Sequence, residues 1–236
     1  MRSQNLTLMA KKNSEHDEEV IVDVVESYNK TQQYLLDNQR QLTIFGGLLV
    51  LIIGGYFGFT KLYMEPLEAE AREQMWKAEQ YFEKDSLDLA IYGDGNYYGF
   101  EAIIDNYSMT ESANLAKYYL GVIHYKKGEF EIALSHLEDF YSEDVMVSSV
   151  AKGLIGDCYV ALNDYDDAVA YYLKAAKDEV NKFTTPIYLK KAAVTFETMG
   201  EYKKALKSFN EIKNKYPQSQ EGRDIEKYIA RVEGKM

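Results

Sequence analysis

One stretch of the chain has neither a charged side chain nor a regular polar face. It runs from Gln41 to Thr60 and reads QLTIFGGLLVLIIGGYFGFT. A helix rises about 1.5 Å per residue, so these 20 residues span roughly 30 Å, the thickness of a bilayer's hydrocarbon core. Backbone amides in lipid must be paired within the segment, so a helix is the expected state. The pattern predicts a transmembrane helix over residues 41–63, with Tyr56 and Tyr63 toward one interface.

A buried core helix and a cleaved signal peptide both fit the apolar stretch less well. A core helix of a soluble protein rarely runs this long without a polar face. A cleaved signal peptide begins near the N-terminus, whereas this stretch begins at residue 41, after an acidic tail. The nearby basic residues number two before the span and three after it, so charge does not set the orientation; they are Lys30 and Arg40, then Lys61, Arg72 and Lys77.

Glycines mark one face of the predicted span. Gly54 and Gly58 have the four-residue spacing that lets two membrane helices approach closely, and Gly47 lies two turns earlier on much the same face. Glycine is common in membrane helices for other reasons too. The three glycines are therefore a candidate helix-packing surface, and plain compositional bias stays open as the alternative.

The tail before the span, residues 1–40, is polar and slightly acidic. Its first part, through about Glu19, has the composition of a disordered segment. From Val20 to Leu35 apolar residues recur at helical spacing and predict a short amphipathic helix. This helix lacks the basic face of lipid-binding helices, which favours a protein contact or a simple extension of the anchor.

Beyond the span, hydrophobic and polar positions repeat with a long period. Three stretches align on turn residues that are 35 and 37 residues apart, and each turn has a small residue before it and an aromatic, an alanine and a large side chain after it. The aligned sets are Gly128, Asn163 and Gly200 at the turn; Gly121, Gly156 and Ala193 before it; then Phe130, Tyr165 and Tyr202; Ala133, Ala168 and Ala205; and Leu137, Tyr172 and Phe209. Small residues let antiparallel helices pack closely, and Gly or Asn adopts the left-handed conformation that ends a helix. The period predicts three helical hairpins.

Two less regular elements flank the hairpins. Glu65 to Lys84 has a long helical pattern, and Phe100, Ile103 and Tyr107 repeat the spacing of the later second helices. Together they predict one irregular N-terminal hairpin with a long connector. At the other end, residues 219–232 predict a polar capping helix, which a stack of repeats needs to cover its last apolar face.

This repeated pattern resembles the tetratricopeptide repeat over about residues 113–218. It departs from that family at the first signature position, where Lys117, Lys152 and Leu189 replace a tryptophan or similar large residue. With the predicted span, the resemblance implies an all-α fold: a single transmembrane helix followed by an α-solenoid of three good hairpins, one irregular hairpin and a cap. The expected domains are a tail at 1–40, the span at 41–63 and a repeat domain at 64–236.

In proteins of this kind the first helix of each hairpin lines a groove that binds other proteins. By that resemblance the candidate partner-binding residues are Tyr118, Val122, Tyr125, Asp157, Val160, Lys190 and Val194. A mixed aromatic and aliphatic groove suits a helix or an extended apolar segment. Family members that clamp a terminal carboxylate use Lys, Arg and Asn here, and only Lys190 is of that kind. The same positions also suit core residues between hairpins, so both interpretations stay open.

Composition narrows the remaining chemistry. A net charge of -11 argues against nucleic acid as a partner, because phosphate binding needs clustered Lys and Arg. The three histidines and Cys158 show no metal-site spacing, and Cys158 is expected to be a packed free thiol. No phosphate-binding glycine loop and no nucleophile–base pair is recognisable. We therefore expect no catalytic site, no cofactor, no metal and no small-molecule substrate.

The order of tail, single anchor and repeat domain resembles the bacterial ancillary SecYEG translocon subunit (YfgM-type) family. That resemblance implies a single-pass inner-membrane protein with a cytosolic N-terminal tail and periplasmic repeats. Its implied partners are translocon subunits, a periplasmic chaperone or an exported client, and the lipid bilayer through one helix. Two alternatives stay open: a structural subunit or assembly factor of another envelope or secretion complex, and a cytosol-facing adaptor of reversed topology.

Overall fold

The structure, a computed structural model, describes residue 30 and residues 32–178 and 180–236. It divides into two compact units between Tyr63 and Met64, which are described separately. The predictions for the start of the tail, including most of the amphipathic helix, lie outside the described residues. Residues 32–37 are helical, and the Leu35 side chain is exposed.

In the first unit the apolar stretch is helical. Helix α2 (Gln39–Phe59) is followed by a π-helical turn (Thr60–Met64). Thr43 and Thr60 donate hydroxyl hydrogen bonds to the carbonyl oxygens four residues earlier, at 2.8 and 2.9 Å, which pairs these polar groups within the helix. The helical run Gln39–Glu83 is long and apolar enough to cross a membrane by length and composition, and its apolar window is 0% buried.

The three candidate packing glycines, Gly47, Gly54 and Gly58, all lie in α2. A Cβ atom added to any of them would meet no atom of another described residue within 4 Å. Among the described residues of this unit, nothing therefore requires a residue as small as glycine at these positions.

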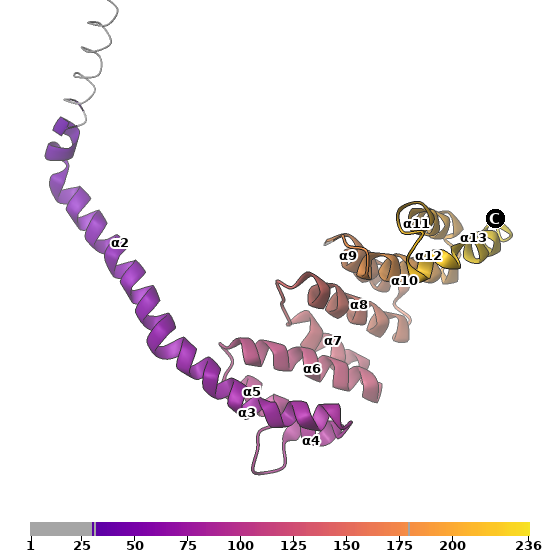
Figure 1. Ribbon diagram of the computed structural model, residues 1–236, viewed down its shortest axis with the longest axis horizontal. Coiled ribbons are helices and arrows are strands. Elements are labelled where there is room, and N and C mark those ends of the chain that lie inside the picture. Colours follow the sequence, from indigo (N-terminus) through magenta and orange to yellow (C-terminus); the bar gives the residue numbers. More distant parts are fainter. Residues whose placement is uncertain (1–29, 31, 179) are drawn as a thin grey trace, which may run out of the picture. The chain divides into compact units, whose positions relative to one another are not determined.

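The second unit is a stack of helices, and its described residues contain no β-strand (Figure 1). The helices are α3 (Glu65–Glu83), α4 (Leu87–Tyr92), α5 (Phe100–Asn106), α6 (Glu111–Lys127), α7 (Phe130–Glu138), α8 (Val145–Ala161), α9 (Tyr165–Lys177), α10 (Thr184–Thr198), α11 (Tyr202–Lys215), α12 (Gln220–Arg223) and α13 (Ile225–Glu233). Pairs α6–α7, α8–α9 and α10–α11 are the three predicted hairpins, so the predicted all-α fold is confirmed.

The turn residues behave as their identities predict. Gly128, Asn163 and Gly200 have φ angles of 79°, 63° and 76°, the left-handed region that ends a helix at little cost for Gly and Asn. Asp164, directly after the second turn, caps α9 by accepting a hydrogen bond from the Asp167 amide at 3.4 Å. The periodic turns are therefore set by local backbone chemistry.

Close approach within each hairpin depends on the small residues. A Cβ at Gly121 would overlap the Leu137 side chain, and a Cβ at Gly156 would overlap the Tyr172 ring. In each case the sequence alignment pairs these positions across the same hairpin. The alanines that follow the turns, Ala133, Ala168 and Ala205, are fully buried. The predicted role of the small residues in hairpin packing is confirmed.

The irregular N-terminal hairpin differs from expectation in its connector. The segment expected to be a loop contains helix α4, whose Ala90 and Ile91 are fully buried in the core formed with α3, α5 and α6. The following loop is closed by a single antiparallel bridge between Gly93 and Tyr98. Burial of this short apolar stripe, and not helix propensity, explains why six residues are helical here.

The cap consists of two helices, α12 and α13, and not of one. Gly222 in α12 lies directly against the backbone of Tyr216 and Pro217, so closely that a Cβ atom would overlap the Tyr216 carbonyl. The chain leaves this contact at Asp224 before α13 begins. Helix α13 then buries Ile225, Ile229 and Val232 against the last hairpin.

A buried carboxylate ties α13 to the third hairpin. Glu197 of α10 accepts hydrogen bonds from Arg231 at 2.6 Å and from Lys235 at 2.8 Å, and its side chain is only 8% exposed. Burial opposes ionisation, but the two cations outweigh it and hold the pKa of the Glu197 carboxyl below its usual value. The cap is therefore fixed by charge as well as by apolar contact.

Candidate functional site

Four of the seven predicted partner-binding residues line one groove between α8 and α10. They are Asp157 and Val160 from α8 and Lys190 and Val194 from α10. The groove has a volume of about 410 Å³, and its other lining residues are Tyr172, Ile187, Lys191, Thr195 and Glu221. Three helices and the start of the cap therefore contribute side chains to it.

The other three predicted residues, all on α6, lie outside this groove. The Tyr118 and Phe140 rings pack with their centroids 5.3 Å apart. The Tyr125 and Phe130 rings pack edge-on with their centroids 5.7 Å apart. Val122 is half-buried on the same helix. Tyr118 and Tyr125 therefore contribute to packing within the first hairpin as well as to its surface.

Asp157 is the centre of a polar network among the residues that line the groove. The Tyr172 hydroxyl donates a hydrogen bond to its Oδ1 atom at 2.5 Å. The Lys191 ammonium donates to Oδ1 at 2.7 Å and to Oδ2 at 2.6 Å. Charge-assisted bonds of this kind are roughly twice as strong as neutral ones. The Asp157 charge is thus compensated inside the protein, and the network links all three helices around the groove.

Glycine on α8 makes room for the rings around this network. A Cβ atom at Gly153 would overlap the Tyr188 ring, so Tyr188 of α10 packs directly on the α8 backbone. The Tyr172 and Tyr188 rings lie nearly parallel, with centroids 6.5 Å apart, and the Lys191 ammonium lies 5.6 and 5.9 Å from the two centroids. The small residue therefore sets how near α8 and α10 approach.

The wall of the groove is apolar and partly open to solvent. Ile187 and Val194 are each 38% exposed, and Val160 is half-buried beside them. Lys190 lies 4.8 Å from the Tyr228 ring centroid and forms no ion pair with a carboxylate among the described residues. The groove thus offers apolar contact and one cation that could pair with an acid of a partner.

Alkaline pH should weaken the packing of Tyr188. Burial, with a smaller effect from Asp157, raises the pKa of its phenol to about 12 in the folded protein, against about 10 in an unfolded chain. The stabilisation is therefore complete below about pH 10 and is lost as pH rises toward 12. We expect the free energy of unfolding, measured by urea titration, to fall over that pH range. The fall should be smaller in Tyr188→Phe by up to about 1.4 kcal/mol per pH unit. If the free energy of unfolding depended on pH equally in the variant and the natural chain, the raised pKa of Tyr188 would be contradicted.

The repeated hairpins match known proteins in sequence. Two family models, each described as a tetratricopeptide repeat, match residues 122–182 and 189–219. This chain carries tetratricopeptide repeats. A TPR repeat-containing protein of Methanocaldococcus jannaschii is 31% identical over 133 residues, which make up 56% of this chain and 23% of that protein. The chain therefore corresponds to less than a quarter of the length of this relative.

Tetratricopeptide repeats are protein–protein interaction scaffolds and are generally not catalytic, so the groove between α8 and α10 is a candidate binding site for protein. Within the described part of the chain, no group of three or more His, Cys, Asp or Glu residues could hold a metal ion. Cys158 is buried and free, and burial raises the pKa of its thiol to about 12, as expected of a packed and unreactive side chain. The prediction of a packed thiol is confirmed.

Lys191 and Tyr172, which belong to the network, and Tyr188, which packs beside it, are absent from the predicted site. Tyr172 occupies a repeated position for a large side chain, which indicates core packing and gives no sign of its hydrogen bond to Asp157. A usable signal is the run of small residues before Asp157. Gly153 and Gly156 open that face of α8 to large side chains from neighbouring helices.

Proposed function

We propose that this chain is a membrane-anchored scaffold that holds a segment of another protein in the groove between α8 and α10. The observation that supports this most directly is the groove's open apolar wall, formed by Val160, Ile187 and Val194. Binding sites combine such apolar lining with a few placed polar groups. Lys190, which has no ion-pair partner among the described residues, favours a segment that carries an acidic side chain beside its apolar ones.

Helix α2 is the anchor in this proposal. Its apolar window has no buried residue, as a segment exposed to lipid requires. The glycine face of Gly47, Gly54 and Gly58 is open and would contact a translocon subunit in the membrane. The N-terminus would be cytoplasmic and the repeats periplasmic, where the groove would meet a chaperone or an exported client of the Sec translocon. This finer assignment is supported by the resemblance in domain order.

A pull-down of the full chain in mild detergent, followed by mass spectrometry, tests both parts of the proposal. We expect translocon subunits and periplasmic chaperones to copurify with the natural chain. Replacing residues 41–60 with a generic apolar span should remove the translocon subunits. Lys190→Gln should reduce the soluble partner several-fold, whereas Lys203→Gln, an exposed lysine on α11, should not.

Other outcomes of the pull-down would each reject one part of the proposal: the translocon role, the topology or the binding groove. A stable, stoichiometric set of other envelope proteins, indifferent to the span, would favour a structural subunit or assembly factor. Cytosolic partners alone would require the reversed topology. Equal losses in Lys190→Gln and Lys203→Gln would show that the groove between α8 and α10 does not bind the partner.

A further inference from the structure

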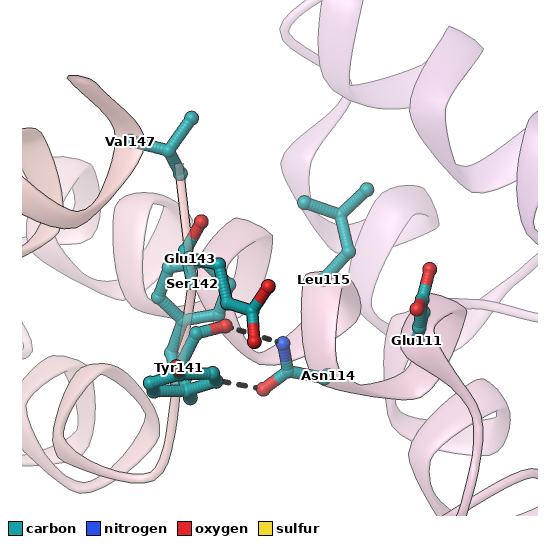
Figure 2. Close-up of a pocket in the computed structure, with 8 residues that line it drawn as sticks. Glu111, Asn114, Leu115, Tyr141, Ser142, Glu143 and Val147 are labelled. Atoms are coloured by element: carbon teal, nitrogen blue, oxygen red, sulfur yellow. Dashed lines mark hydrogen bonds between the residues drawn. The ribbon is translucent and has the colours of Figure 1, made fainter. Parts of the chain in front are cut away.

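A second groove lies at the edge of the repeat unit where α6 and α8 begin (Figure 2). It has a volume of about 480 Å³. Its lining residues are Glu111, Asn114 and Leu115 at the start of α6, Phe140, Tyr141, Ser142 and Glu143 from the connection between α7 and α8, and Val147 of α8. None of them lines the groove between α8 and α10, so this edge groove is a separate surface.

The wall of the edge groove is held in place by the protein itself. The Asn114 amide donates to the Tyr141 carbonyl oxygen at 2.7 Å, and the Tyr141 backbone N–H donates back to Asn114 Oδ1 at 3.1 Å (Figure 2). Lys117 adds a hydrogen bond to the Asp139 carbonyl oxygen at 3.4 Å. The connection after α7 is thereby tied to α6 at several points, so a partner would bind without first having to order it.

Apolar side chains are exposed around this groove, and packing of the fold does not account for their exposure. Tyr141 is 69% exposed, and Val145, Met146 and Val147 in the first turn of α8 are 36–42% exposed. The start of α8 is already capped by Asp144, which accepts hydrogen bonds from the Met146 and Val147 amides. A run of exposed apolar residues beside a formed groove is typical of an interaction surface.

Two carboxylates flank the groove, and neither has a hydrogen bond or an ion pair within the described part of the chain. In the view of Figure 2, Glu143 and Glu111 lie on opposite sides of Leu115. Glu111 is the first residue of α6, where an acid stabilises the helix dipole. Glu143 precedes the cap of α8 and has no such role.

The adjoining hollow shares Glu111 and also contains Glu68 and Arg72, which pair with each other at 3.4 Å. That ion pair is neutral as a whole, so it supplies no positive charge to offset Glu111 and Glu143. The whole chain has a net charge of -11.

We infer that the edge groove docks a partner protein through a segment that combines apolar side chains with Lys or Arg. Leu115, Val147 and Tyr141 would contact the apolar side chains, while Glu111 and Glu143 would pair with the cations. Long basic side chains can lay their stems on apolar surface while the charge reaches the rim. This preference for basic segments is opposite to the preference for acidic segments proposed for the groove between α8 and α10. One scaffold would therefore hold two segments of different charge.

Fluorescence anisotropy with the full chain in mild non-ionic detergent tests this inference. The probe is a short labelled peptide in which leucine, lysine and serine alternate, with a titration of detergent alone subtracted. Glu111→Gln/Glu143→Gln should weaken binding about fivefold, as expected for two exposed ion pairs. Val147→Ser should weaken it about threefold through lost apolar contact. The same peptide with glutamate in place of lysine should find no cation in the edge groove, so Glu111→Gln/Glu143→Gln should not weaken any binding that it shows.

The matched control is Glu101→Gln/Glu131→Gln, which removes two first-turn acids from α5 and α7 and changes the net charge equally. It should alter the dissociation constant less than twofold, and circular dichroism should show unchanged helicity in every variant. Equal weakening in both double variants would mean general charge attraction and would overturn the site. Absence of binding to the natural chain would overturn it as well.

Lys190→Gln separates this inference from the proposed function. It should leave binding of the lysine peptide unchanged. If it altered that binding, the peptide would lie between α8 and α10, and the edge groove would be rejected while the first groove stood.

Discussion

Replacing Phe209 with alanine is expected to lower the free energy of unfolding by about 3–5 kcal/mol. Phe209 is fully buried in the core of the last two hairpins and the cap, and its ring lies 5.5 Å from the Tyr228 ring of α13. The cost combines the lost transfer of the ring from water with the cavity that it leaves. Because the cap packs on this ring, the variant should also loosen α13.

The measurement is urea unfolding of the detergent-solubilised chain, followed by far-ultraviolet circular dichroism. Phe183→Ala is the matched control, because Phe183 is 72% exposed and its removal should change stability by less than about 0.5 kcal/mol. Amide hydrogen exchange should report faster opening of α13 in Phe209→Ala alone. Equal stability of the two variants would show that Phe209 does not support the core as described.

Replacing Asp157 with alanine is expected to cost about 2 kcal/mol of stability. The change leaves the Tyr172 hydroxyl and the Lys191 ammonium without their acceptor in a part-buried site. Leaving a buried donor unpaired costs more than the net gain of the original hydrogen bond. The loss should appear in urea unfolding at neutral pH.

Asp105→Ala, on the exposed side of α5, is the control for the Asp157 variant and should stay within about 0.5 kcal/mol of the natural chain. The double variant Asp157→Ala/Lys191→Met should lose less than the sum of its single variants, because the two residues share one interaction. Strict additivity would contradict the network.

Local backbone chemistry explains why the hairpins could be predicted from sequence. Gly128, Asn163 and Gly200 are the residues that a left-handed helix end requires, so their spacing reports the repeat directly. Helix α4 was missed because its six residues depend on burial of Ile91 against distant helices. The break in the cap was missed for a similar reason, since it depends on the approach of Gly222 to the Tyr216 carbonyl.

The candidate site was predicted only in part, for a geometrical reason. The helical period places Asp157, Val160, Lys190 and Val194 on the first helices, and these four line one groove. It does not say whether Lys190 or its neighbour Lys191 faces Asp157, since successive residues differ by about 100° around a helix. That choice depends on how α8 and α10 cross, which depends in turn on Tyr188 packing over Gly153.

The cap also limits how far the array can grow. Helix α13 lays Ile225, Ile229 and Val232 over the apolar side of the last hairpin and leaves charged residues such as Glu233 exposed. An apolar face left uncovered at the end of a stack would be free to pack on another molecule, and head-to-tail contacts generate open filaments. The ion pairs of Glu197 with Arg231 and Lys235 hold that face closed. The cap would therefore oppose such association through residues that line neither the groove between α8 and α10 nor the edge groove.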